Sequence, residues 1–226
     1  MIIDNTYFKG EIYIPHAKPS VNDAVTGVEQ DIISFINEYA NDCLVKCLGQ
    51  ELRDELVDNL DETSLTWVDA LANVKWDYLV NGLTYVDPNT GVQVKWRGLR
   101  FKSNVFGNGE YDKSLLAYYT YFYYEKDDYI TRATLGSFVE ESTAGAVAVP
   151  PNDKAVNAWN KFVDLAQGKD SYKVIKQTTL GPAIDYSGQS REVSLYKFIE
   201  DQNTIAANTY ANFDPKVWTK MNLFNL

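Results

Sequence analysis

The spacing of apolar residues along the chain predicts a mainly helical protein. A stripe of apolar positions runs from Val28 to Leu48 at steps of three and four residues. It follows Thr26-x-x-Glu29, a capping-box sequence that is typical of a helix start. We expect Gly49 to end this helix, and leucines at positions 52, 56 and 60 continue the same period in a second one.

Three more segments show helical spacing, over residues 67–79, 114–126 and 153–167. Asn81-Gly82 follows the first of them and Gly168 follows the last, and glycine commonly ends helices. Asn152 or Asp153 is a suitable cap for the start of the last segment.

Strand signals are fewer. Residues 83–86 and 92–96 flank a turn with well-placed Pro and Gly, Asp87-Pro88-Asn89-Thr90-Gly91, which predicts a β-hairpin near 83–96. Residues 6–14 alternate and end at Pro15, so we expect a strand or an extended arm there. A short strand pair is expected within 172–199.

The end of the chain is expected to be an appendage. Residues 201–213 are rich in Asn, Ala and Thr and predict little intrinsic order. Residues 214–226 predict a short amphipathic helix carrying Trp218, Met221 and Phe224. We expect this tail to dock on a neighbouring protein, and the alternative is that it folds back on its own domain.

The domain organisation follows from these elements. We expect an N-terminal arm or strand over 1–25, a helical domain over 26–168, and a C-terminal extension with a docking tail over 169–226. The expected fold class is mainly α, a helical bundle with a small β-hairpin and extended N- and C-terminal arms.

Composition narrows the possible classes of protein. With 45% hydrophobic and 23% charged residues in 226 positions, the chain has ordinary globular composition. No apolar run approaches the ~18 residues of a membrane-spanning helix, and the N-terminus does not resemble a secretory signal. One histidine and two cysteines exclude a multi-histidine metal site and a disulfide scaffold.

Charge is distributed unevenly. Twelve acidic residues but only Lys46 and Arg53 lie between Asp23 and Asp69, so this segment carries the whole net charge of −10. A basic stretch, with no acidic residue from 91 to 105, contains Lys95, Arg97, Arg100 and Lys102. This separation suits head-to-tail contact between identical copies. An acidic helix that only keeps the protein soluble is the alternative.

Catalytic chemistry has little support in the sequence. His16 lies between two prolines in an expected turn, without a neighbouring nucleophile motif. Cys43 and Cys47, four residues apart, could supply two metal ligands, but core packing is the better interpretation. Asp127-Asp128 and Glu140-Glu141 could form the paired carboxylates of a glycoside hydrolase, although nothing local raises a pKa. We therefore expect no catalytic residue, no metal and no cofactor.

Tyrosines are concentrated between positions 111 and 129. Because one helix face can bury only part of this set, the others should project onto a neighbouring subunit. The interface candidates here are Tyr118, Tyr119, Tyr121, Tyr123 and Tyr124.

A set of motifs along the first three quarters of the chain supports a resemblance. In chain order they are Asn5 to Pro15, Phe35-Ile36-x-x-Tyr39, Leu48-Gly49, Lys75-Trp76-x-x-Leu79-x-x-Gly82, Trp96-x-Gly98-Leu99, the Tyr119–Tyr124 block and Ala158-Trp159-Asn160. Over roughly residues 5–165 the chain resembles an uncharacterised structural protein of tailed phages and prophages of Bacteroides-type bacteria. By its helical outline it is similar to the head–tail connector or adaptor proteins that form a ring beneath the portal.

The resemblance implies a helical connector-type bundle in a virion neck, assembled in the host bacterial cytoplasm. The implied partners are other copies in a twelve-fold ring, the portal protein, and a neighbouring neck or tail protein. DNA would pass through without sequence-specific contact, and no membrane would be involved. The candidate channel lining is the acidic group Glu51, Asp54, Glu55, Asp58, Asp61 and Glu62. The alternatives are a virion-associated cell-wall hydrolase and a tail-associated binding module.

Overall fold

The computed structural model describes residues 2–14, 32–61, 66–67, 74–102, 113–134, 151–168 and 191–221. The first half holds the 3-10 helices η1 (Asn5–Tyr7) and η2 (Gly10–Ile12), the π-helix η3 (Ile36–Ala40), α2 (Asn41–Leu48), α3 (Gln50–Asp58), β1 (Leu60–Asp61), β2 (Thr66–Trp67), α4 (Val74–Asn81), β3 (Leu83–Val86) and β4 (Gln93–Trp96). The second half holds α5 (Leu115–Thr134), α6 (Pro151–Gln167), β5 (Arg191–Glu192) and α7 (Leu195–Ile205). The prediction of a mainly helical protein is confirmed.

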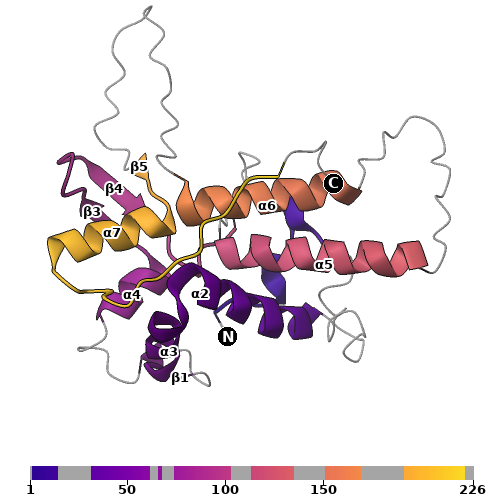
Figure 1. Cartoon of the computed structure of the whole chain (residues 1–226), viewed down its shortest axis with the longest axis horizontal. Coiled ribbons are helices and arrows are strands. Elements are labelled where there is room, and N and C mark those ends of the chain that lie inside the picture. Colours follow the sequence, from indigo (N-terminus) through magenta and orange to yellow (C-terminus); the bar gives the residue numbers. More distant parts are fainter. Residues whose placement is uncertain are drawn as a thin grey trace, which may run out of the picture.

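The long helices α5 and α6 lie side by side and form the centre of the fold (Figure 1). The π-helix η3 and α2 pack against α5, and α7 lies beside the hairpin of β3 and β4. After α7 the chain crosses α2 and runs along α6 to the end of the described residues, so the C-terminal segment lies on the core of its own chain.

The expected break between the first two helices is confirmed. Residues 32–48 are helical, and Gly49 has a φ of 88°, which separates α2 from α3. A side chain is strained in this backbone conformation, and a Cβ at this position would also lie 3.2 Å from the backbone of Asp214. The glycine therefore both turns the chain and lets the C-terminal segment approach.

The hairpin is also confirmed. β3 and β4 pair antiparallel, with Leu83 opposite Trp96 and Val86 opposite Gln93. β5 adds to β4 in parallel, and β1 and β2 form a separate two-stranded pair. The expected helix over 67–79 is wrong at its start, because residues 66–67 pair as a strand and the helix begins at Val74.

Two glycines let the end of α4 contact the end of β4 closely. Gly82 and Gly98 have φ values of 94° and 92°, and each lies against the backbone of the other segment. A Cβ on Gly98 would lie 2.5 Å from the carbonyl oxygen of Val80. The backbone N–H groups of Leu99 and Arg100 donate to the carbonyls at 79 and 80, which holds the two segments together.

The expected strand or extended arm near the N-terminus is instead a pair of 3-10 turns packed on the core. Asp4 caps η1 by accepting a hydrogen bond from the backbone N–H of Thr6, and Gly10, with a φ of 68°, interrupts any strand. Tyr7, Phe8, Ile12 and Ile14 are buried. This burial explains the alternation of apolar residues that suggested a strand.

Residues 201–213 are more ordered than their composition predicts. Residues 201–205 form the last part of α7, and Asp201, Gln202 and Tyr210 are buried. The hydroxyl of Tyr210 donates to the carbonyl of Lys75 at 2.6 Å, and its ring contacts Trp76. Most of the Asn and Thr residues that dominate the composition are exposed. The order of the segment comes instead from one buried aromatic residue, Tyr210, which the composition did not indicate.

Candidate interaction surfaces

The acidic candidates for channel lining are concentrated on α3. Glu51 and Asp58 are exposed, while Asp54 and Glu55 are half-buried and bonded within the chain. Asp54 accepts from Gln50 and Arg53, and these bonds lower the pKa of its carboxyl. Positions 51, 54, 55 and 58 share one face of a helix because they are spaced by three, four and seven residues. The side chains of Asp61 and Glu62 lie outside the described residues.

The four basic candidates differ in their exposure and in their contacts with the rest of the chain. Lys95 and Arg100 are exposed on β4 and just after it. Arg97 forms an ion pair with Glu192 of β5, and its guanidinium lies 4.5 Å from the ring centroid of Phe101. Lys102 donates to the hydroxyl of Thr6 and lies over the ring of Tyr7. Arg97 and Lys102 therefore stabilise the fold through contacts within the chain. The sequence predicted them only as interface residues and did not indicate this structural role.

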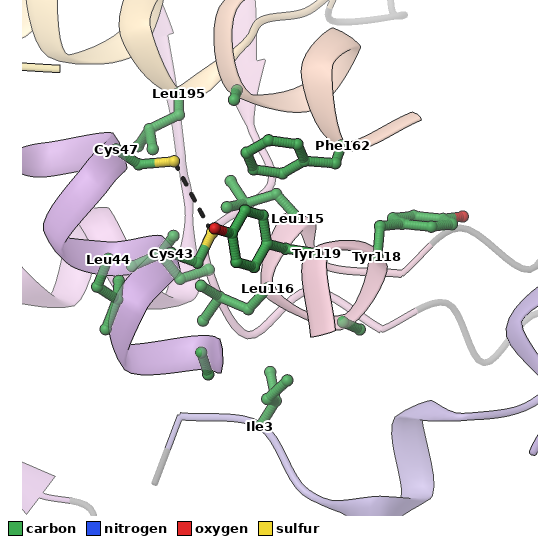
Figure 2. Close-up of a cluster of buried hydrophobic side chains, with 14 of the residues drawn as sticks. Ile3, Cys43, Leu44, Cys47, Leu115, Leu116, Tyr118, Tyr119, Phe162 and Leu195 are labelled. Atoms are coloured by element: carbon green, nitrogen blue, oxygen red, sulfur yellow. Dashed lines mark hydrogen bonds between the residues drawn. The ribbon is translucent and has the colours of Figure 1, made fainter. Parts of the chain in front are cut away.

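The prediction that Tyr118, Tyr119 and Tyr121 project outward is wrong. All three are at most 1% exposed, since the first two turns of α5 are surrounded on every side. Figure 2 shows Tyr119 pointing toward the cysteines of α2, with Tyr118 directed away from them. Tyr118 donates to Glu11 of the N-terminal segment. A helix with apolar and aromatic residues on every face is buried on every face. The tyrosine block therefore indicated a central helix and not an interface.

Tyr119 is the centre of a buried polar contact as well as an aromatic one. Its hydroxyl donates to the carboxylate of Asp42 at 2.6 Å, and it also lies 3.0 Å from the ammonium group of Lys46. Burial and the hydrogen bond to Asp42 raise the pKa of this phenol. Tyr123 and Tyr124 are half-buried, and Tyr123 stacks on Tyr39 at 4.5 Å. A subunit contact through Tyr123 and Tyr124 stays a prediction.

The C-terminal segment is neither a helix nor detached from the domain. Residues 213–221 are extended and follow α2 and α6, and we call them the strap. Gln167 bonds both the N–H and the carbonyl of Trp218, and Asn160 does the same for Met221. Pro215 and these side-chain bonds favour extended backbone over a helix. Phe224 lies outside the described residues.

Trp218 itself is inserted among aromatic rings. Its ring centroid is 5.4 Å from that of Trp159 and 5.2 Å from that of Phe162, both in edge-on geometry. Its indole N–H donates to Tyr196 at 3.0 Å. Trp218 and Met221 were expected on a neighbouring protein, but here they pack on α6 and α7 of the same chain.

A second charged group lies buried between the hairpin and α7. Lys197 pairs with Asp201 and, at 3.3 Å, with Asp87, and both carboxylates are about 1% exposed. Tyr85 donates to Asp201 at 2.8 Å. Burial alone would raise the pKa of Asp87, but bonds from the backbone of Asn89 and from Lys197 outweigh it and lower the pKa. The group ties the hairpin turn to α7.

Asp87→Asn should remove this tie while keeping the acceptor for the turn. We expect a loss of about 2 kcal/mol in the free energy of unfolding at pH 7. A carboxyl whose pKa is lowered by folding stabilises the protein above its unfolded-state pKa, and this stability is lost as pH falls through the folded-state pKa. Denaturant unfolding from about pH 7 to about pH 2 should therefore show a constant difference between wild type and variant down to about pH 4, and a difference that shrinks progressively below it. A difference that stays constant over the whole pH range would contradict the ion-pair interpretation.

Other candidate chemistry finds little support among the described residues. Cys43 and Cys47 are both free and fully buried, 3.8 Å apart at their sulfur atoms, and burial raises the pKa of Cys43 well above its usual value. No group of three or more His, Cys, Asp and Glu side chains in the described ranges could hold a metal ion. Asp127 is exposed on α5, whereas His16, Glu140, Glu141 and the side chain of Asp128 lie outside the described residues. Among the helices that the structure describes, none is long and apolar enough to cross a membrane.

Comparisons of the chain with protein-family models, with curated proteins and with solved structures found no match.

Proposed function

We propose that this protein is a structural subunit of a phage virion neck, a head–tail connector that assembles as a homo-oligomeric ring between portal and tail and surrounds the DNA channel. The observation that supports assembly best is the position of the exposed charged side chains. Glu51 and Asp58 are exposed on α3, while Lys95 and Arg100 are exposed at the hairpin. Figure 1 shows α3 and β4 at different places on the molecule, with α4 between them.

Complementary patches at two different places on one chain favour head-to-tail contact between copies. Such a contact uses a different surface on each partner, and it closes into a ring when the rotation between neighbours divides a full turn. Twelve copies, a portal on one side and a neck or tail protein on the other belong to the same proposal. Assembly would take place in the host bacterial cytoplasm, before the protein is part of the virion.

The mass of the full-length protein in its native state tests the proposal. We expect a closed oligomer of defined copy number at micromolar concentration or above, at low salt. A protein that stays monomeric over this range, alone and with a portal, would overturn the connector proposal. A closed oligomer would also distinguish the connector proposal from the alternatives of a monomeric hydrolase and a monomeric binding module.

Arg100→Glu gives a directed test of the charge contact. Arg100 is exposed, so reversing its charge should weaken assembly about tenfold at low salt and less at high salt, where screening is stronger. Arg97→Glu is a poorer probe because it also breaks the ion pair with Glu192. Lys154→Glu, which makes the same change of charge at an exposed lysine on α6, is the control. Equal assembly of Arg100→Glu and wild type would exclude Arg100 from the contact.

A further inference from the structure

Two free thiols face each other in the core next to the strap. Cys43 and Cys47 lie one turn apart on α2, both are 0% exposed, and their sulfur atoms are 3.8 Å apart. In Figure 2 the side chains of Tyr119 and Leu195 lie beside the two sulfur atoms. The pair therefore has no contact with solvent while the fold around it is closed.

The strap is attached to α2 on both sides of Cys47. The backbone N–H of Asp214 donates to the carbonyl of Leu48 at 3.1 Å, and the backbone N–H of Lys216 donates to the carbonyl of Lys46 at 2.8 Å. Cys47 is the residue between these two acceptors. The strap therefore crosses α2 at the position of the second thiol.

Tyr196 of α7 connects this thiol with the strap. Its hydroxyl donates to the carbonyl of Lys216 at 2.6 Å and accepts from the indole N–H of Trp218 at 3.0 Å. The same side chain hydrogen-bonds Cys47. Removal of the strap takes away the first two partners and uncovers the hydroxyl that lies against the thiol.

The strap can open while the helices stay folded. It belongs to no helix or sheet, and side chains of α6, Asn160 and Gln167, hold much of its backbone. Val217 is 87% exposed, and Trp218 is the large side chain that anchors the segment among aromatic rings. Segments with few buried contacts open at a lower free energy than the core elements that they cover.

The two thiols are placed to form a disulfide once an oxidant reaches them. Residues four apart in an α-helix have Cα atoms about 6 Å apart, which is within the range that a disulfide bridges. In the closed state burial raises the pKa of Cys43 well above its usual value, so this thiol stays protonated and unreactive.

A small-molecule disulfide is an oxidant that balances the reaction. The thiolate of one cysteine attacks a sulfur atom of the reagent, which forms a mixed disulfide and releases the first reagent thiolate. The other cysteine loses its proton and attacks the protein sulfur of this mixed disulfide. The Cys43–Cys47 bond forms and the second reagent thiolate leaves, so two thiols are oxidised, one reagent disulfide is reduced and two protons pass to solvent.

We infer that the strap gates a redox-sensitive thiol pair: it protects Cys43 and Cys47 while it is closed on α2 and α6, and its opening lets a small-molecule disulfide oxidise them to a disulfide. All the contacts that carry this inference lie within one copy of the chain. It is therefore independent of the proposed ring, and it is tested on the monomer.

Reaction of the full-length protein with dithionitrobenzoate, at about pH 8 without denaturant, measures the gate. Trp218→Ala should release the coloured reagent thiolate at least tenfold faster than wild type, because its strap is open for more of the time. Val217→Ala, at the exposed neighbouring residue, should react at the wild-type rate. Two coloured thiolates per chain, and a protein mass lower by about 2 Da with no adduct, identify the Cys43–Cys47 disulfide.

Gly98→Ala distinguishes opening of the strap from unfolding of the whole domain. It should destabilise the fold at least as much as Trp218→Ala, but it acts at the contact between α4 and β4. Low concentrations of urea give a second measurement, because local opening exposes little surface and its rate should change little with urea.

Three results would overturn the inference. The thiols react through global unfolding if Gly98→Ala speeds the reaction as much as Trp218→Ala, or if the rate rises steeply with urea. Equal rates for wild type and Trp218→Ala would show that the strap does not cover the pair. A stable mixed disulfide in place of the Cys43–Cys47 bond would show that the two thiols do not act together.

Discussion

Gly98→Ala is expected to destabilise the protein by about 4 kcal/mol, or roughly 8–16 °C in the midpoint of thermal unfolding. Part of the effect is the φ of 92°, which costs an alanine about 1 kcal/mol. The larger part is steric, because the new methyl group would lie 2.5 Å from the carbonyl oxygen of Val80 and 2.6 Å from the backbone of Gly82. Backbone on that side cannot rotate away as a flexible side chain can. The two segments must separate, which weakens the hydrogen bonds from Leu99 and Arg100 to α4.

Gly91→Ala is the matched control for this prediction. Gly91 also has a positive φ, of 69°, but a Cβ there would meet nothing within 4 Å. This variant should therefore lose only the conformational part, about 1 kcal/mol. Thermal or denaturant unfolding of both variants measures the difference directly. Equal losses would show that the close contact between α4 and β4 contributes nothing beyond backbone strain.

The sequence predicted the elements whose signals are local. The hairpin has turn residues between two short apolar segments, and Gly49 and Gly168 follow apolar stripes of helical period, so these boundaries were found. Gly98 gave no comparable signal. Its role depends on Gly82, sixteen residues earlier, and only the folded chain brings the two backbones together.

The surfaces were harder to predict because exposure depends on the whole fold. The tyrosines of α5 were expected outside on the assumption of one buried helix face, but α5 is enclosed by α2, α6 and the N-terminal segment. Lys9 and Lys113 were missed as spatial neighbours of Lys102 for a related reason. Their neighbours in space come from segments about ten and ninety residues away, which no spacing along the chain reports.

The second large expected effect is a loss of stability when the strap, residues 213–221, loses its tryptophan. Trp218→Ala should lower the free energy of unfolding by about 3 kcal/mol, roughly 6–12 °C in the thermal midpoint. The substitution removes the ring that packs on Trp159 and Phe162, together with the hydrogen bond to Tyr196. It also loosens the backbone that Gln167 binds, because the indole holds the strap in register with α6.

The neighbouring residue supplies the control. Val217 is 87% exposed, so Val217→Ala should change the thermal midpoint by about 1 °C or less. Both variants should be measured on monomeric protein, at a concentration below that at which any oligomer forms, so that assembly does not contribute. A tail that served only to dock on another protein would give no loss for Trp218→Ala in the monomer. A loss several times that of Val217→Ala would show that the strap is part of its own domain's core.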